Sequence, residues 1–514
     1  MKDYINIRLV SACTALVLTT MTGVTAAQCQ KRGGVLRIAD SVPAGLDPHL
    51  TTSFSSMAVY EHMYNGLVTQ GYDTKIKPDL AEKWDISDGG KSYTFHLRKG
   101  VKFHNGREMV ADDVVYSLQR LLDPTTQAPL AGYYSSIDKV VTVDKYTARI
   151  LLKTPDSSLL YKLSNRRPAV IMAKEVVIAN GGHLKTADAG TGPFKLTELV
   201  PDVNVKLQGF TDYFEKGLPC LDGVTILFNN DESARLAALR SGQVDTTFFK
   251  DPKNAEVLKN NANLTILAQP SQARDVLILN NAYPPLDNKK VRQALSYAIN
   301  RQDVLDVAYN GKGYLTGVIP PGESVWAIPA TLENYPIYAF NVAKAKQLIA
   351  ESGVKTPIKI VVNTPTMFPQ SVPIAQLLKE QLKAIDVNVE INVMEWAAYQ
   401  AAERKREFQV QVGGFSGRPD PDVYVYGEFH SQAPGNVSRI NSPLVDKLAE
   451  QGRATTDLAQ RQKIYAEAQK AIVDEAGFLF LGVGTDYEVL SKKIKGFQLM
   501  ANRFRLSVKE VWLD

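Results

Sequence analysis

The sequence contains little cysteine and little histidine, which limits the metal and thiol chemistry it can support. It has 3 cysteines and 6 histidines in 514 residues, and the histidines are scattered singly. It also lacks a His-Glu-x-x-His motif, a Cys-x-x-Cys pair, a Gly-rich phosphate loop and a Gly-x-Ser-x-Gly motif. These absences argue against a metalloenzyme, a nucleotide hydrolase and an α/β-hydrolase. We therefore expect no metal and no cofactor.

An excess of charge of one sign is also missing. The 59 Lys and Arg residues are interspersed with 54 Asp and Glu residues, which gives a formal net charge of +5. A nucleic-acid-binding protein would show a basic patch or stripe, so we expect no nucleic-acid partner. The composition, 45% hydrophobic and 22% charged, is that of a folded globular protein. Because single cores stop growing near about 250 to 300 residues, two or three domains are expected.

The N-terminus lacks an apolar run long enough for a membrane helix. Lys2 and Arg8 precede a stretch of apolar and small residues, 9–24, which is rich in Thr, Ser and Ala and is followed by small residues. A membrane span needs about 20 strongly apolar residues. The pattern therefore predicts a cleaved secretory signal over residues 1–27. Cys13 follows Arg8 with almost no apolar run between them, so we do not expect it to accept a lipid.

Cleavage of this signal would leave one pair of cysteines, Cys29 and Cys220. Each lies a few residues before a predicted strand, at Val35–Ala39 and at Val224–Phe228. We expect these strands to run parallel in one sheet, so that both begin at the same edge. In an oxidising compartment an even pair placed in this way predicts a disulfide.

From Gly33 onward, strand-like and helix-like stretches alternate, which predicts α/β domains. One βαβ unit runs from Val224–Phe228 to Val244–Phe249, with Asp231 as the cap of the helix between them. A second unit begins at the strand 358–363 and ends at an alternating strand, 389–393. We expect the two units to form two separate sheets and hence two lobes.

The remaining segments are placed around these two units. Residues 76–190 read as an inserted subdomain with hairpins and a capped helix at Ala111–Leu122. A strand at Val276–Asn280 is a candidate crossing between the lobes. A helix at Lys289–Ile299, with its apolar residues on one face, opens the second lobe.

Three loops next to strand ends are candidate binding loops: 40–49, 190–194 and 413–422. Such loops carry ligands in α/β proteins. The alternative interpretations, without a role in binding, are a tight turn at 190–194 and a turn with solvated charges at 413–422. Together with the end of the candidate crossing strand, these loops supply the candidate ligand-binding residues: Ser41, Gly192, Asn280, Phe415, Ser416, Arg418, Asp420 and Asp422.

The chain resembles the family 5 extracellular solute-binding proteins. The resemblance is strongest over residues 71–118, above all in IKPDLAEKWDISDGGKSYTFHLRKGVKFHNGREMVADDVVYSL. It continues in GGVLRIADSVPAGLDPH, GTGPF, NNDESARLAALRSGQVD and LDNKKVRQALSYAINRQDV, and reaches the C-terminal KIKGFQL and VWL. The resemblance therefore covers nearly the whole chain from Gly33 onward.

This resemblance implies an α/β, two-lobed periplasmic binding protein of type II, enlarged by the extra subdomain and with hinge strands between the lobes. Lobe I would comprise residues 28–272 plus 487–514, and lobe II residues 273–486. The protein would be a periplasmic monomer, not an enzyme. It would hand a small-molecule or peptide solute to the permease and ATPase of an ABC transporter at the inner membrane.

One departure from the family concerns the charge of the solute. Peptide-binding members resemble one another in an Asp that follows a Gly-Trp pair and takes the peptide ammonium group. Here the pair is Gly414-Phe415, and the Asp is replaced by Arg418 or, in another alignment, by Gly417. Arg binds carboxylates and phosphates, so we expect an acidic or opine-like solute. Alternatively, Arg418 pairs with Asp420 or Asp422.

Three other functions remain open at this point. Within the family, the solute could be a metal chelate of the nickel or haem type. Outside it, a secreted hydrolase could use Asp420 and Asp422 as acid and base, if their surroundings separate their pKa values. A periplasmic chaperone would need a large exposed apolar patch.

Overall fold

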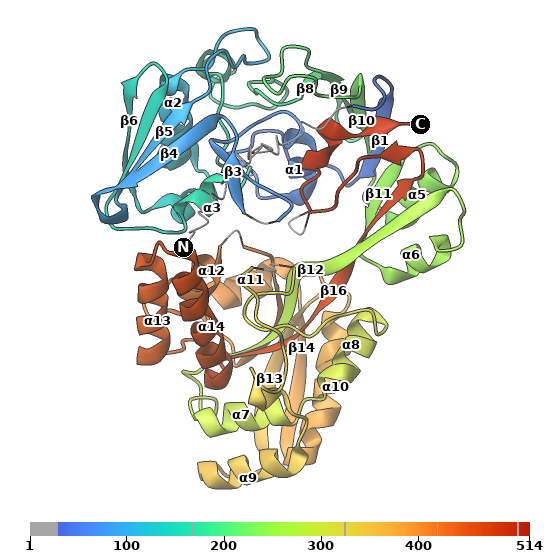
Figure 1. Cartoon of the computed structure of the whole chain (residues 1–514). Coiled ribbons are helices and arrows are strands. Elements are labelled where there is room, and N and C mark those ends of the chain that lie inside the picture. Colours follow the sequence, from blue (N-terminus) through green and yellow to red (C-terminus); the bar gives the residue numbers. More distant parts are fainter. Residues whose placement is uncertain (1–28, 74, 167, 323–324, 419, 501–502) are drawn as a thin grey trace, which may run out of the picture.

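The computed structural model describes residues 29–514 except positions 74, 167, 323–324, 419 and 501–502. The predicted signal, residues 1–27, lies outside the described residues. Figure 1 shows two lobes, one above the other, with the strands β12 and β16 running between them.

The main sheet is continuous through both lobes, in the order β14-β13-β15-β12-β16-β11-β1-β10-β9-β8. Our expectation of two separate sheets was wrong. β12 has 16 residues and β16 has 14, and at about 3.3 Å per residue both are long enough to pair within each lobe. The strands are β1 (Val35–Asp40), β8 (Phe194–Val200), β9 (Asn204–Gly209), β10 (Gly223–Phe228), β11 (Thr246–Phe249), β12 (Leu264–Leu279), β13 (Ile358–Pro365), β14 (Val387–Met394), β15 (Val410–Phe415) and β16 (Phe478–Ser491).

The antiparallel pairing of β12 with β16 is interrupted where the lobes meet. The register shifts between Pro270 and Arg274, and again between Asp275 and Val276. Proline cannot donate a backbone hydrogen bond, so a ladder is easily broken there. Residues 276–279 of the predicted crossing strand, 276–280, form the final part of β12, and Asn280 follows it. The interruption lies just before this final part and is the natural place for a hinge.

In lobe I, β1 lies between β10 and β11 and pairs parallel with both. The first predicted βαβ unit is confirmed: the carboxylate of Asp231 accepts a hydrogen bond from the Ser233 N–H and so caps the connecting helix. The parallel pairing of the strands that follow the two cysteines is confirmed as well. The helices of this part are α1 (Phe54–Tyr60), α5 (Glu232–Arg240) and α6 (Pro252–Leu258).

The segment expected to form a subdomain folds into an antiparallel sheet, β4-β5-β7-β6, against which α2 packs. The predicted helix at 111–122 is confirmed with the same bounds. The elements of this segment are β3 (Ile76–Pro78), β4 (Ala81–Ser87), β5 (Ser92–Leu97), α2 (Ala111–Leu122), β6 (Ile137–Asp144), β7 (Thr147–Leu152), α3 (Leu159–Leu163) and α4 (Lys174–Ala179). The strand β2 (Val68–Gln70) precedes the segment and pairs with β3 in a separate two-stranded sheet.

In lobe II, β13 and β14 pair parallel and are joined by a helix, which confirms the second βαβ unit. The helices are α7 (Lys289–Tyr297), α8 (Arg301–Tyr309), α9 (Val342–Ser352), α10 (Ser371–Leu382), α11 (Trp396–Lys405), α12 (Pro421–Phe429), α13 (Pro443–Ala454) and α14 (Leu458–Glu475). In Figure 1, α12, α13 and α14 stand at the left, below the subdomain.

The buried apolar side chains form separate clusters in the two lobes. The lobe I cluster runs from Leu36 to Phe228 and resumes at Leu490–Val511, whereas the lobe II cluster runs from Val276 to Leu481. A smaller third cluster surrounds α5 and α6. The C-terminal segment, with the short strands β17 (Ile494–Lys495) and β18 (Trp512–Leu513), thus packs on lobe I. We propose that the lobes divide at the boundaries expected above.

Six short 3-10 helices complete the described secondary structure: Asp88–Gly90, Pro124–Thr126, Ala131–Tyr134, Pro336–Tyr338, Lys383–Ile385 and Leu506–Glu510. Among residues 29–514, with the gaps given above, no helix combines the length and the apolar character that crossing a bilayer requires.

Candidate functional site

The loop after β15 lies against the hinge part of β12. Residues 274 and 275 of β12 pair with Phe415 and Gly414 of β15. A Cβ atom added to Gly417 would stand 2.3 Å from Oε1 of Gln272, so only glycine permits this approach of the loop to the crossing strand. The strand end expected to carry ligand-binding residues is therefore fixed beside the hinge.

Arg418, Arg274 and Glu428 form a cluster, here called the arginine cluster. Nε of Arg418 donates to Oε1 of Glu428 at 3.2 Å, while Nη2 of Arg274 donates to Oε2 of the same carboxylate. The partner of Arg418 is thus Glu428, and neither of the two aspartates considered above. The Arg274 side chain is 0% exposed and its guanidinium lies over the ring of Tyr424, at 4.6 Å from the centroid.

The arginine cluster contains two cations and one carboxylate. Nε and Nη1 of Arg274 have no hydrogen-bond partner among the residues that the structure describes. Burial disfavours the charged form of Arg418, but Glu428, Tyr133 and Tyr424 hold the pKa of Arg418 above its ordinary value. Tyr133 belongs to lobe I, so Arg418 lies where the lobes face each other. The two guanidinium groups next to this boundary attract an anion, while the nearby Glu403 carboxylate of α11 adds a second negative charge that acts on Glu428.

Asp420 and Asp422 point to arginines of lobe II. Arg461 holds Asp420 with two hydrogen bonds, of 2.6 and 2.9 Å, and Nη2 of Arg453 donates to Asp422 at 2.8 Å. The two carboxylate side chains are 0% and 1% exposed. Asp420 also accepts the Asp422 N–H and caps α12. In this structure the two carboxylates therefore join the start of α12 to α13 and α14.

The other predicted site residues occupy different places. Phe415 packs its ring against Phe478 at 5.4 Å, and Ser416 is half-buried in the loop that follows. Asn280 is fully buried, and its Nδ2 donates to the carbonyls of residues 406 and 408. It therefore ties two chain segments of lobe II together.

Two of the predicted residues lie in lobe I. Ser41 is half-buried after β1, and its N–H donates to the carboxylate of Asp40. Gly192 is buried, and a Cβ atom there would stand 2.4 Å from the Met63 carbonyl carbon. The glycine thus permits close packing of the 190–194 loop on the chain after α1. Their roles in binding stay predictions.

A cavity in lobe I was missed by the sequence analysis. It has a volume of about 50 Å³ and contains ion pairs between Arg505 and the carboxylates of Asp40 and Glu488, and between Arg503 and Asp486. Asp40 stands at the carboxyl end of β1, a usual ligand position in α/β sheets. However, 465 residues separate it from its partner Arg505, so only the tertiary structure joins them.

The histidines do not form a metal centre in the described part of the chain. No group of three or more His, Cys, Asp or Glu side chains with the geometry of a metal site occurs among those residues. Burial lowers the pKa of both His49 and His62 to about 3, so both are neutral.

The two lobes and the strands that cross between them define a periplasmic binding protein of type II fold. A solved structure with the same architecture is the periplasmic binding protein AgaA from A. tumefaciens R10 in complex with agropinic acid. It is 28% identical, with a TM-score of 0.76, and the alignment covers 94% of this chain and 99% of that chain.

Two curated relatives match over similar lengths. Di/tripeptide-binding protein 1 of Pseudomonas aeruginosa is 29% identical over 90% of this chain and 91% of the relative. Heme-binding protein A of Haemophilus influenzae is 30% identical over 93% of this chain and 92% of the relative.

The family model "Bacterial extracellular solute-binding proteins, family 5 Middle" matches residues 75–436. The chain therefore belongs to the family 5 bacterial extracellular solute-binding proteins. It is a binding protein that serves an ABC transporter, and it is not the secreted hydrolase considered as an alternative.

Proposed function

We propose that this protein carries an acidic, opine-like or peptide-like solute whose carboxylate is bound by Arg418. The observation that carries the proposal is the arginine cluster beside the hinge, where two guanidinium groups share one carboxylate. A planar guanidinium fork suits a carboxylate, and a buried cation without full compensation gains from an anionic partner. The agropinic acid complex of AgaA supports the acidic class.

The family supports the remainder of the proposal. We propose that residues 1–27 are removed on export, and N-terminal sequencing of the exported protein tests this. The mature monomer would then deliver its solute to the permease and ATPase at the inner membrane. A metal chelate is the second candidate solute within the family, since the heme-binding relative matches nearly the whole chain.

The first experiment identifies the solute and removes its proposed anchor. Mass spectrometry of compounds released by denaturing the purified protein names the ligand, and calorimetry measures its affinity. Arg418→Ala should lower that affinity by about thirtyfold to several thousandfold, that is about 2 to 5 kcal/mol, because the bound carboxylate loses its charged partner. The exposed Arg404→Ala on α11 is the matched control and should leave the affinity unchanged.

A second variant tests the direction of the electrostatic effect. Glu428→Gln removes the internal counter-charge, so an acidic solute should bind as tightly as before or more tightly, while circular dichroism checks the fold. Unchanged affinity in Arg418→Ala, or tight binding of neutral dipeptides by the wild type, would contradict the proposal.

A further inference from the structure

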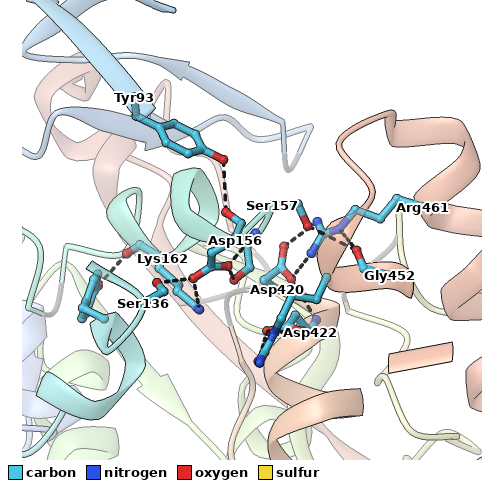
Figure 2. A network of polar contacts seen from close by, with 12 residues as sticks. Tyr93, Ser136, Asp156, Ser157, Lys162, Asp420, Asp422, Gly452 and Arg461 are labelled. Atoms are coloured by element: carbon cyan, nitrogen blue, oxygen red, sulfur yellow. Dashed lines mark hydrogen bonds and ion pairs between the residues drawn. The ribbon is translucent and has the colours of Figure 1, made fainter. Parts of the chain in front are cut away.

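The lobes touch at a second place, away from the hinge. In Figure 1 the hinge strands run between the lobes, and to their left α3 of the subdomain faces α12, α13 and α14 of lobe II. Figure 2 shows this contact from close by, with Ser157 next to Gly452. The Ser157 N–H donates to the carbonyl of Arg453 at 3.3 Å, and its hydroxyl donates to the carbonyl of Gly452 at 3.2 Å.

These two carbonyls belong to the last turn of α13. The last four carbonyl groups of an α-helix have no partner within the helix and need hydrogen-bond donors from outside. Nε of Arg461 also donates to the Gly452 carbonyl, at 3.2 Å. Ser157 therefore supplies, from the other lobe, part of the C-terminal cap of a lobe II helix.

On the lobe I side, the conformation of the Ser157 segment is fixed by Asp156. Its carboxylate, 3% exposed, accepts from Nζ of Lys162 at 2.8 Å and from the hydroxyl of Ser136 at 2.6 Å. The Tyr93 hydroxyl donates to the Asp156 carbonyl at 3.1 Å. The donors of Ser157 are thus held in place before the lobes meet.

The lobe II side is fixed in the same way. Arg461 pairs with Asp420 and Arg453 with Asp422, so both ion pairs lie within lobe II (Figure 2). The contacts across the boundary include the two Ser157 hydrogen bonds and an edge-to-face contact of Tyr161 with Trp326, 5.8 Å between ring centroids. The Asp156 carboxylate of lobe I also attracts the Arg453 guanidinium of lobe II. Separation of the lobes therefore breaks the hydrogen bonds and the ring contact and weakens this attraction, while the ion pairs within each lobe stay intact.

We propose that the contact of Ser157 and Tyr161 with Gly452, Arg453 and Trp326 is a reversible latch that holds the lobes closed. Each lobe carries a preformed half of the latch, so opening costs little and closing needs no rearrangement. A few hydrogen bonds and ring contacts shift an open–closed equilibrium modestly, by about threefold to thirtyfold. The latch thus tunes the population of the closed form without contacting the solute-facing arginine cluster.

A disulfide across the latch tests the proposal in the mature chain. Ser157→Cys combined with Arg453→Cys places two thiols on residues whose backbones are hydrogen-bonded, which is close enough for a disulfide. The control pair combines Ser157→Cys with Lys447→Cys, an exposed position earlier on the same helix. We expect the latch pair to cross-link at least about tenfold faster than the control pair in the solute-free protein.

The second readout is the radius of gyration from X-ray scattering. The cross-linked latch variant should be more compact than the same variant after reduction, and circular dichroism of the reduced form verifies the fold. Cross-linking no faster than in the control pair would overturn the latch. So would an unchanged radius of gyration after cross-linking, because the contact would then not keep the cleft closed.

Discussion

Asp275 is a buried carboxyl group at the second register shift of the hinge strands. It accepts hydrogen bonds from the Tyr309 hydroxyl and from Nε2 of Gln370, and Lys250 of lobe I attracts its charge. Burial outweighs these contacts and raises the pKa of Asp275 to about 6. The charged form is therefore disfavoured in the folded protein compared with the unfolded chain, whose Asp side chains titrate near about 3.9.

We predict that Asp275 makes the protein less stable as the pH rises from about 4 to about 6. The folded state keeps this proton at a pH where the unfolded chain has released it, so the penalty grows over this window and is constant above it. At about pH 7 the penalty is about 3 kcal/mol. Urea unfolding of Asp275→Asn should show a gain over the wild type near neutral pH that disappears toward about pH 4.

A gain for Asp275→Asn that does not change with pH would contradict the predicted titration.

At the scale of elements, the parallel pair β1 and β10 places the residues before each strand side by side. Val35 is opposite Gly223 in the register, and the structure joins Cys29 to Cys220 by a disulfide, across a sequence separation of 191 residues. The Cys220 N–H also donates to the carbonyl of Lys509. The C-terminal segment therefore contacts the disulfide region at the edge of the sheet where β1 and β10 begin. Three distant parts of lobe I are thus held together.

We predict that this bridge forms in the exported protein and contributes up to about 5 kcal/mol to the free energy of unfolding, because it closes a very long loop in the unfolded chain. The Cys29→Ser/Cys220→Ser variant should unfold at a lower urea concentration, and the reduced wild type should match it. Thiol labelling of unreduced, unfolded mature protein should find no free cysteine. Two free thiols would refute the pairing.

At the scale of the whole molecule, a single sheet passes through both lobes, and the pairing of its two crossing strands shifts register near residues 270–276. We therefore expect motion between the lobes to be concentrated in the two crossing strands, since each lobe has its own buried cluster. A solute that contacts both lobes shifts the population toward the closed form.

We predict that saturating solute lowers the radius of gyration of the solute-free protein, as measured by X-ray scattering. The oxidised Ser157→Cys/Arg453→Cys variant should show no such change, because it is already closed. An identical radius of gyration for the free and loaded wild type would argue against closure of the cleft.

The sequence by itself determined the local elements and the family. Caps and periodicity placed the helix 111–122 and the βαβ units because these signals act over a few residues. The segment 76–118 identified the family because its residues are contiguous. The absence of the acidic residue expected from the family resemblance, with Arg418 or Gly417 in its place, was visible in the same way.

Only the tertiary structure decided which charges meet. It gave Arg418 the partner Glu428, paired Asp420 and Asp422 with Arg461 and Arg453, and brought Arg505 to Asp40. It also merged the two expected sheets into one. Pairings between residues tens to hundreds of positions apart depend on how the chain packs, and buried charges must find partners wherever packing places them. Sequence periodicity carries no information about that choice.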